Sequence, residues 1–282
     1  MNVLVTGGSG FIGSHVIDVL VERGDVVTNL DKKPSHRNDI IHRTGSLLDR
    51  VLIDAEVEKA DAVYHIGGFS NIDLVKNSPV ETIEMNVLST LYLLDSCRRK
   101  GIKRFLYASS VYACERKGHL YTTSKFASER IIEDYSSLYG VPYTILRYAT
   151  VYGPRSREAD VVYLFTKAAK HDGRIEIHGD GMQSRNFTHV RDVAEGSVAA
   201  LQSETCVNQT VVVGGRNRTS INELAKKIVK IVNPQCRIVY KESPRCQDYV
   251  GDVDCVDESN DRLRWAPRVT LDEGIAALET LL

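Results

Sequence analysis

The chain has 282 residues, and its 36 lysines and arginines nearly balance its 37 aspartates and glutamates, which leaves a formal net charge of −1. Because no basic excess is available to replace counterions on a phosphate backbone, the composition argues against a nucleic-acid-binding protein. Hydrophobic residues make up 43% of the chain, as in ordinary folded proteins. Their runs fall far short of the roughly 20 residues needed to cross a bilayer. We therefore expect neither a nucleic acid nor a membrane as partner.

The first half alternates short apolar runs with segments of helical period. The expected strands are Asn2–Thr6, Val26–Asp31, Ala62–Ile66, Arg104–Ser110 and Tyr143–Tyr148, and the expected helices are Phe11–Arg23, Val80–Lys100 and Tyr121–Tyr139. Strands that alternate with helices of this length predict right-handed crossovers and a parallel, doubly wound α/β sheet of the Rossmann type. The strands are apolar at nearly every position, which favours burial on both faces.

After Gly153-Pro154 the pattern changes. The expected elements are a helix at Asp160–His171, a strand at Arg174–His178, a return to the main sheet over Thr188–Gln202, a strand at Thr210–Val213, a helix at Ile221–Val232, a strand near Arg237–Tyr240 and a last helix near Leu271–Leu282. We therefore expect a main domain over residues 1–150, to which 188–215 returns. Residues 151–187 and 216–282 would form a smaller, partly interleaved region over the carboxyl edge of the sheet.

A glycine-rich loop, TGGSGFIG at residues 6–13, follows the first strand and opens the first helix. In this context Gly7 permits a tight turn, Gly10 lets the backbone approach a pyrophosphate, and Gly13 lets the helix pack closely on the strand. The helix N-terminus offers unpaired N–H groups to the phosphates. The loop predicts a dinucleotide site.

Asp31 ends the second strand, 18 residues after Gly13 (31 − 13). This is close to the spacing of about 20 expected for a carboxylate that binds the adenosine ribose. A carboxylate repels a 2′-phosphate, so Asp31 favours NAD over NADP, although Lys32 and Lys33 weaken that preference.

Residues 121–125 read YTTSK, and a spacing of four places Tyr121 and Lys125 on one face of a helix. A free tyrosine has a pKa near 10 and is a poor base at neutral pH. A neighbouring ammonium and a bound nicotinamide cation would both favour the phenolate and lower that pKa. The preceding strand ends in Ser109-Ser110, and alternation along the strand allows only one of these hydroxyls to face a site at its carboxyl end.

Together these segments resemble the extended short-chain dehydrogenase/reductase family, in its NAD-dependent nucleotide-sugar epimerase/dehydratase group. The motifs run nearly end to end: TGGSGFIGSH (6–15), DAVYHIGG (61–68), MNVLSTLYLL (85–94), RFLYASSVYA (104–113), YTTSK (121–125), LRYATVYGP (146–154), IHGDGMQSRNFTHVRDVAEG (177–196) and RLRWAPRVTLDEG (262–274). Eight motifs in the family's order are much more specific for the family than for the substrate.

The resemblance implies a role for each matching position. Cofactor contacts fall on Gly7, Gly10, Phe11, Ile12, Gly13, Asp31, Gly67, Gly68, Asn86 and Lys125. The catalytic trio falls on Ser110, Tyr121 and Lys125, and substrate contacts fall on Thr150, Arg185 and Arg245. No metal is implied, and the cofactor implied is NAD.

Two departures from the family pattern affect the function. The segment from the strand-end serines to Val111-Tyr112 is two residues shorter than usual. That shortening leaves Ser109 as an alternative to Ser110, and it removes the Asp-Glu pair of the sugar 4,6-dehydratases, which argues against dehydration. In addition, Thr150 stands where relatives usually carry an asparagine that contacts the substrate phosphate.

The resemblance therefore implies a nucleotide-sugar 4-epimerase of the UDP-hexose type, which works by transient hydride transfer to tightly bound NAD through a 4-keto intermediate. The alternatives are an NAD(P)-dependent nucleotide-sugar ketoreductase or dehydrogenase and a non-catalytic NAD-binding member. The resemblance also implies a homodimer formed by the helices after the fourth and fifth strands. Six scattered cysteines without ligand spacing, expected to be free thiols, and a start without a basic leader favour a cytoplasmic setting.

Overall fold

The computed structural model describes residues 1–70, 72–114, 119–242 and 262–282. Its centre is a seven-stranded, entirely parallel sheet in the order β11-β6-β5-β4-β1-β2-β3. The strands are β1 (Asn2–Thr6), β2 (Val26–Asp31), β3 (Ile41–Thr44), β4 (Ala62–His65), β5 (Arg104–Ser110), β6 (Tyr143–Tyr148) and β11 (Gln209–Val213). The predicted Rossmann-type sheet is therefore confirmed.

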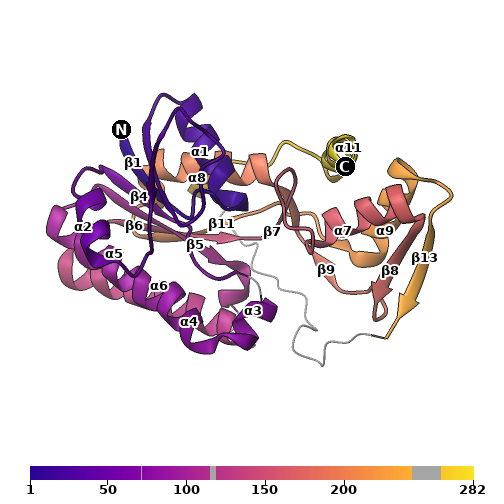
Figure 1. Ribbon diagram of the computed structural model, residues 1–282, viewed down its shortest axis with the longest axis horizontal. Coiled ribbons are helices and arrows are strands. Elements are labelled where there is room, and N and C mark those ends of the chain that lie inside the picture. The colour runs from indigo at the N-terminus through magenta and orange to yellow at the C-terminus, as the bar shows by residue number, and fades with distance from the viewer. Residues whose placement is uncertain (71, 115–118, 243–261) are drawn as a thin grey trace.

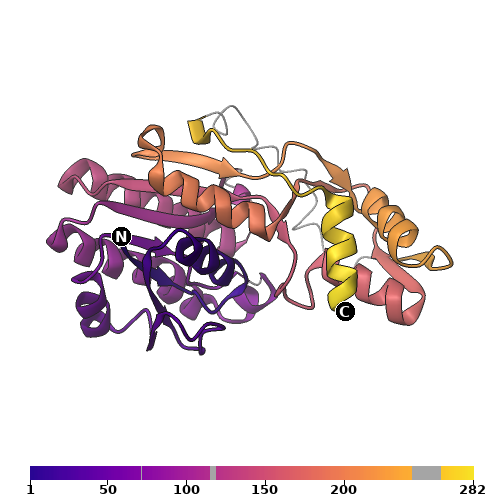
Figure 2. The same cartoon turned by 90° about the horizontal axis from the view of Figure 1, so that it is seen from above.

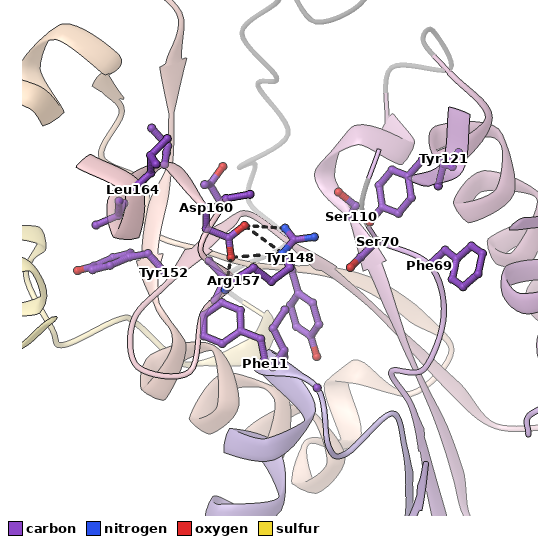
Figure 3. A pocket seen from close by; sticks show the side chains of 18 of the residues that line it. Phe11, Phe69, Ser70, Ser110, Tyr121, Tyr148, Tyr152, Arg157, Asp160 and Leu164 are labelled. Atoms are coloured by element: carbon purple, nitrogen blue, oxygen red, sulfur yellow. Dashed lines mark hydrogen bonds and ion pairs between the residues drawn. The ribbon is translucent and has the colours of Figure 1, made fainter. Parts of the chain in front are cut away.

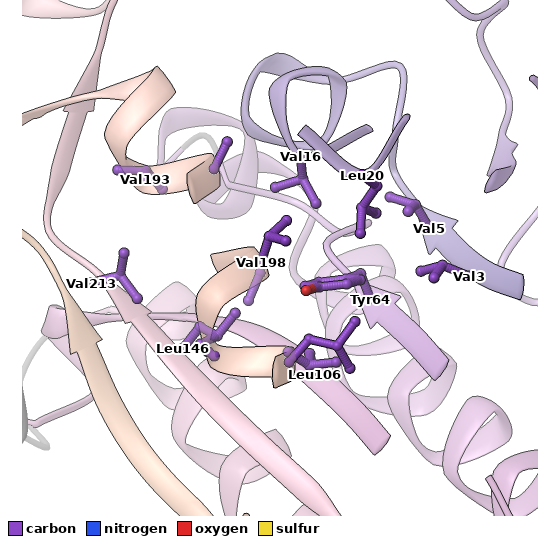
Figure 4. Close-up of a cluster of buried hydrophobic side chains, with 14 of the residues drawn as sticks. Val3, Val5, Val16, Leu20, Tyr64, Leu106, Leu146, Val193, Val198 and Val213 are labelled. Carbon is purple, nitrogen blue, oxygen red and sulfur yellow. The ribbon is translucent and has the colours of Figure 1, made fainter. Parts of the chain in front are cut away.

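Helices cover both faces of this sheet (Figure 1). One face carries α1 (Phe11–Glu22) and α8 (Val190–Gln202), and the other carries α2 (Arg50–Val57), α5 (Ser89–Lys100) and α6 (Leu120–Tyr139). Under α1 and α8 lies a dry core built from β1, β4, β5, β6 and β11 (Figure 4). Its two tyrosine hydroxyls are satisfied at Ser197: Tyr64 donates to the carbonyl at 3.0 Å, and Tyr148 is hydrogen-bonded to the side-chain hydroxyl at 2.9 Å.

A smaller region lies beyond the carboxyl end of the sheet, to the right of β7 (Thr150–Tyr152) in Figure 1 and at the right of Figure 2. Its helices are α7 (Val161–Lys167), α9 (Ile221–Val232) and α11 (Leu271–Leu281), and its strands are β8 (Arg174–His178), β9 (Ser184–Arg185), β10 (Phe187–His189), β12 (Thr219–Ser220) and β13 (Arg237–Lys241). These strands pair as β7 with β10, β9 with β12, and β8 with β13. A separate apolar core holds this region together.

The segment expected as one helix over Val80–Lys100 contains a break. It consists of α4 (Pro79–Ile83), a single π-helical turn (Glu84–Leu88) and α5, and the short helix α3 (Ile72–Asn77) precedes it. The Asn86 carbonyl in the π turn accepts hydrogen bonds from the hydroxyls of Thr90 at 2.7 Å and Ser128 at 2.8 Å. A π turn often marks a functional position in a helix, and here it points the Asn86 side chain at the loop after β4.

Other differences from the expectations are local. Residues 187–189 pair with β7 rather than with the main sheet, whereas α8 and β11 do pack on or join that sheet. Short 3-10 turns lie at Val111–Cys114 and Glu204–Cys206, and a π-helical turn at Ala168–Asp172 continues α7. Cys97, Cys206 and Cys236 are free and buried, but Cys114 is disulfide-bonded, so the expectation of free thiols throughout was wrong. None of the described helices has the length and apolar character needed to cross a bilayer.

Candidate active site

In the glycine loop between β1 and α1, the backbone of the loop lies close to the start of α1 and to the segment after β4, with no side chain between them. Gly7 has a φ of +71°, and a Cβ there would lie 2.5 Å from the Cα of Gly67 at the end of β4. A Cβ on Gly13 would lie 2.3 Å from the Gly7 carbonyl oxygen. Gly10, by contrast, is exposed and is the N-cap of α1. The loop therefore leaves the helix N-terminus accessible from a large cleft, as a phosphate site requires.

Asp31 lies at the mouth of the same cleft, at the end of β2. Its carboxylate accepts the Ser9 N–H at 3.1 Å and the Lys33 N–H at 2.9 Å, so it is held against the glycine loop. The side chains of Lys32 and Lys33 are exposed. This position suits a carboxylate that binds a ribose beside the pyrophosphate site.

Gly67 and Gly68 form the opposite wall, and Asn86 lies behind them. A Cβ on Gly68, whose φ is +153°, would lie 2.6 Å from the Asn86 side-chain oxygen. That oxygen accepts the Phe69 N–H at 2.7 Å, and the Asn86 amide donates to the Phe69 carbonyl at 3.1 Å and to Ser124 at 2.9 Å. Asn86 is buried behind the wall, so it positions the loop and α6 rather than facing the cleft.

The three candidate catalytic side chains come from two elements that meet at the carboxyl end of the sheet. Tyr121 and Lys125 lie on α6, and Ser110 is the last residue of β5. The Ser110 side chain lies beside Tyr121 (Figure 3), close enough to favour the phenolate form of Tyr121. The Lys125 ammonium donates to the Ala108 carbonyl at 2.7 Å and lies 6.0 Å from the centre of the Tyr121 ring. All three residues line the cleft.

Ser109 points to a different set of partners. Its hydroxyl donates to Glu129 on α6 at 2.5 Å, and Glu129 is also paired with Arg147 on β6. Alternation along β5 thus separates the two serines, and Ser110 is the one that reaches Tyr121. The structure places Ser110, and not Ser109, with the other two candidates.

Burial controls the ionisation of this group. Burial raises the pKa of Tyr121 to about 12, and the hydrogen bond from Ser110 and the charge of Arg157 only partly oppose it. Burial likewise lowers the pKa of Lys125 to about 8. The expectation that Lys125 lowers the pKa of Tyr121 is therefore not met in the protein alone: burial dominates, and the groups that oppose it are Ser110 and Arg157.

The cleft continues from the glycine loop across the trio into the smaller region, with a volume of about 2950 Å³. Thr150 and Arg185, both half-buried, line this distal part, and the Arg185 guanidinium donates to the Ser184 carbonyl at 2.7 Å. Arg245 lies outside the described residues. Arginine suits this wall because its planar fork binds phosphate through two hydrogen bonds.

Two further side chains at the site were not anticipated. Arg157 projects into the cleft across from Tyr121 and is held by Asp160, with Nη2 to Oδ1 at 2.7 Å (Figure 3). The His119 ring stacks on Tyr121, with 6.1 Å between the ring centres. For His119, the only feature of the sequence that indicates a role is its place just before the helix that carries Tyr121. For Arg157, it is only its closeness to Gly153-Pro154.

The donor set fits a dinucleotide. Side-chain-free backbone at Gly7, Gly10 and Gly13 leaves room for a pyrophosphate, Asp31 offers a ribose acceptor, and Lys125 lies deeper in the same cleft.

Comparison with known proteins agrees with this geometry. A Methanocaldococcus jannaschii protein that carries the provisional name UDP-glucose 4-epimerase is 31% identical over 97% of this chain and 95% of its own length. The UDP-N-acetyl-alpha-D-glucosaminuronate decarboxylase of Bacillus cytotoxicus is 32% identical over 84% of this chain and 82% of its own. The UDP-glucose 4-epimerase of Thermotoga maritima, solved with UDP-glucose, superposes with a TM-score of 0.89 at 28% identity, over 99% of this chain and 98% of its own.

The family model for the NAD dependent epimerase/dehydratase family matches residues 3–214, which include the glycine loop, the trio and the distal arginine. Structures of that fold have been solved with the implied cofactor, as in MoeE5 with UDP-glucose and NAD, which has a TM-score of 0.88 and 26% identity over 99% of this chain and 98% of its own. With the match over most of its length, the chain belongs to the NAD-dependent epimerase/dehydratase family.

Proposed function

We propose that the protein is a nucleotide-sugar 4-epimerase of the UDP-hexose type that works with tightly bound NAD. The observation that carries the proposal is the meeting of Ser110, Tyr121 and Lys125 between a dinucleotide cradle and a distal wall with arginines. The UDP-glucose 4-epimerase of Thermotoga maritima supports the choice of reaction. The segment after the strand-end serines is two residues shorter than the family pattern, which supports epimerisation over dehydration.

Tyr121 is the proposed base. As a phenolate it takes the proton from the 4-hydroxyl of the sugar and later returns it, while Ser110 holds the same oxygen by a hydrogen bond. Lys125, as an ammonium, favours the phenolate and can bind a ribose hydroxyl. When bound, NAD supplies a reversible hydride acceptor, so the net reaction is redox-neutral. The 4-keto sugar rotates in the site so that its opposite face is reduced, which inverts the configuration at carbon 4.

The distal wall is the proposed nucleotide side of the substrate site. Arg185 and Thr150 would bind the diphosphate, and Arg245 is proposed from the resemblance alone. We propose accordingly that residues 1–150 and 188–215 form the cofactor domain. Residues 151–187 and 216–282 would then form the substrate region.

We expect a homodimer, because apolar side chains are exposed on the helices that the family resemblance places at its interface, with Val80 66% and Leu138 70% exposed. Sedimentation of wild type and Leu138→Glu tests this. A cytoplasmic setting is expected from the sequence.

The first experiment assays the purified protein with UDP-glucose, UDP-glucuronic acid and UDP-N-acetylglucosamine, without added cofactor. We expect the 4-epimer of at least one, with no net change in NADH absorbance, and NAD among the small molecules released on denaturation. Stoichiometric oxidation of a reduced cofactor would instead identify a ketoreductase. Bound NAD with no product from any sugar would favour a non-catalytic member.

The second experiment replaces the base. Tyr121→Phe removes one hydroxyl, and we expect kcat to fall by about 10²–10⁴-fold with NAD still bound. Tyr139→Phe is the matched control, since Tyr139 lies at the exposed far end of the same helix. Undiminished turnover in Tyr121→Phe would refute the assignment of the base.

A further inference from the structure

A buried carboxylate next to the trio has no part in the proposed chemistry. Glu129 is 2% exposed and lies on α6, one turn beyond Lys125. Its oxygens accept the Ser109 hydroxyl at 2.5 Å and the Arg147 guanidinium at 2.9 Å from Nε and 2.6 Å from Nη2. Burying a charge is costly unless it is paired and hydrogen-bonded. Glu129 therefore needs both Ser109 and Arg147 as partners.

The first consequence is geometric. Ser109 and Ser110 lie opposite Arg147 and Tyr148 in the pairing of β5 with β6. The bonds from Glu129 to Ser109 and Arg147 tie the ends of β5 and β6 to α6, so they fix the end of β5, which carries Ser110, relative to α6, which carries Tyr121. Glu129 therefore joins α6, β5 and β6 at the register that assembles the trio.

The second consequence is electrostatic. Residues four apart on a helix have their Cβ atoms about 5–6 Å from each other, and Lys125 and Glu129 are both buried on the same side of α6. Burial lowers the pKa of Lys125 to about 8, and the charge of Glu129 opposes that effect. At neutral pH this opposition decides how fully Lys125 is charged.

The other groups around Lys125 cannot replace this charge. Tyr107 on β5 and Tyr121 on α6 present neutral rings to the ammonium, at 4.8 and 6.0 Å from their centres. His65 on β4 is neutral, because burial lowers its pKa to about 3. Arg147 on β6 pairs with the far side of the same carboxylate, and a cation there does not favour a second cation.

We propose that Glu129 is a positioning residue of the site: through Ser109 it holds the end of β5, which carries Ser110, against α6, which carries Tyr121, and its charge stabilises the Lys125 ammonium. This inference rests on the proposed function, since it assigns Glu129 to the same trio.

The test of the electrostatic half does not depend on turnover. Lysines are ¹³C-methylated, Lys125 is assigned by its loss in Lys125→Arg, and its titration is followed by NMR. In Glu129→Gln, which keeps the shape and removes the charge, we expect Lys125 to titrate about one pH unit lower than in wild type. Glu129→Asp, which keeps the charge, should return the titration toward wild type. Glu133→Gln, on the same helix and paired with exposed Arg130, should leave it unchanged.

The kinetic half uses the epimerase assay. The alkaline limb of kcat should move down by the same amount in Glu129→Gln, whereas Ser109→Ala should lower kcat several-fold without moving that limb. If Glu129→Gln does not fold, Glu129→Gln/Arg147→Met removes both charges together. An unchanged Lys125 titration, or an unchanged kcat in Ser109→Ala, would overturn the corresponding half. Absence of epimerase activity in wild type would overturn the proposed function and leave the NMR result standing.

Discussion

Gly10 and Gly13 serve the cofactor loop for different physical reasons, and alanine substitution separates them. Gly10 has a φ of −83°, which alanine can adopt, and its added Cβ would lie 3.2 Å from the Gly7 oxygen. We expect Gly10→Ala to keep nearly the wild-type free energy of unfolding and to bind NAD at least about tenfold more weakly, because the methyl group occupies the pyrophosphate path. Urea denaturation and calorimetric titration with NAD measure the two effects.

Gly13→Ala is the contrasting variant. Its Cβ would lie 2.3 Å from the Gly7 oxygen, so backbone must shift, and we expect a loss of about 1–3 kcal/mol in the free energy of unfolding together with the loss of NAD binding. Equal effects of the two substitutions on stability would contradict this separation.

Asp31 should determine the choice between the two nicotinamide dinucleotides. Asp31→Asn removes the charge that repels a 2′-phosphate, while exposed Lys32 and Lys33 remain. We expect NAD to bind about tenfold more weakly and the preference for NAD over NADP to shrink, as measured by titration with each cofactor. Asp39→Asn, on the neighbouring loop, is the control. A preference that does not change would show that Asp31 only holds the loop through Ser9 and Lys33.

At this scale the sequence predicts residues whose role depends on local spacing. The glycine loop, Asp31 and the Tyr121–Lys125 pair were predictable, because their roles depend on spacings within one helical turn or one strand–helix–strand unit. The choice between Ser109 and Ser110 required the partner Glu129, which lies 20 residues away on α6. The position of Arg157 across the cleft from Tyr121 depends on how the two regions of the chain pack together. Spacing in the sequence does not predict that packing.

Elements were predictable where the apolar pattern is strong. β1, β2, β5 and β6 have the predicted bounds, whereas β3 was missed because it is a short edge strand with mostly exposed side chains. The π turn at Glu84–Leu88 was missed because it keeps the apolar pattern of the surrounding helix. Its position becomes visible only through the Asn86 contacts.

The buried lysine on α6, Lys125, should lower the stability of the folded chain at neutral pH. The pKa of Lys125 is lowered from 10.5 to about 8, so the unfolded chain binds more protons than the folded chain between these pH values. Stability from this group therefore increases as pH rises from about 8 to 10.5, and below 8 the buried charge is destabilising. We expect Lys125→Met to raise the free energy of unfolding at pH 7 by about 1–3 kcal/mol and to abolish turnover.

Urea denaturation at pH 7 and pH 10 measures this change in the cofactor-free protein. The advantage of Lys125→Met over wild type should shrink at the higher pH, because wild type no longer buries a full charge. Lys226→Met, an exposed lysine on α9, should show no such pH dependence. A Lys125→Met protein that is less stable than wild type at pH 7 would mean that the bond to the Ala108 carbonyl outweighs desolvation.

At the scale of the whole molecule, one buried carboxylate connects the cofactor sheet to the distal region. Asp192, 1% exposed at the start of α8, accepts the backbone N–H groups of Arg268 and Val269, each at 3.0 Å. These residues lead into α11, which packs on α7 and α9. The contact therefore fixes the distal wall of the cleft relative to the sheet.

Asp192→Ala removes both acceptors, and we expect it to lower the free energy of unfolding by about 1–3 kcal/mol. Because the glycine loop does not depend on Asp192, NAD affinity should stay at the wild-type value, whereas UDP should bind more weakly as α11 loosens. Hydrogen exchange should speed up over residues 268–282 and remain unchanged in β1 and α1. Asp272→Asn, which breaks only the surface ion pair of α11 with Lys227, is the control. Equal weakening of NAD and UDP would mean that Asp192 stabilises the chain as a whole instead of holding one wall of the cleft.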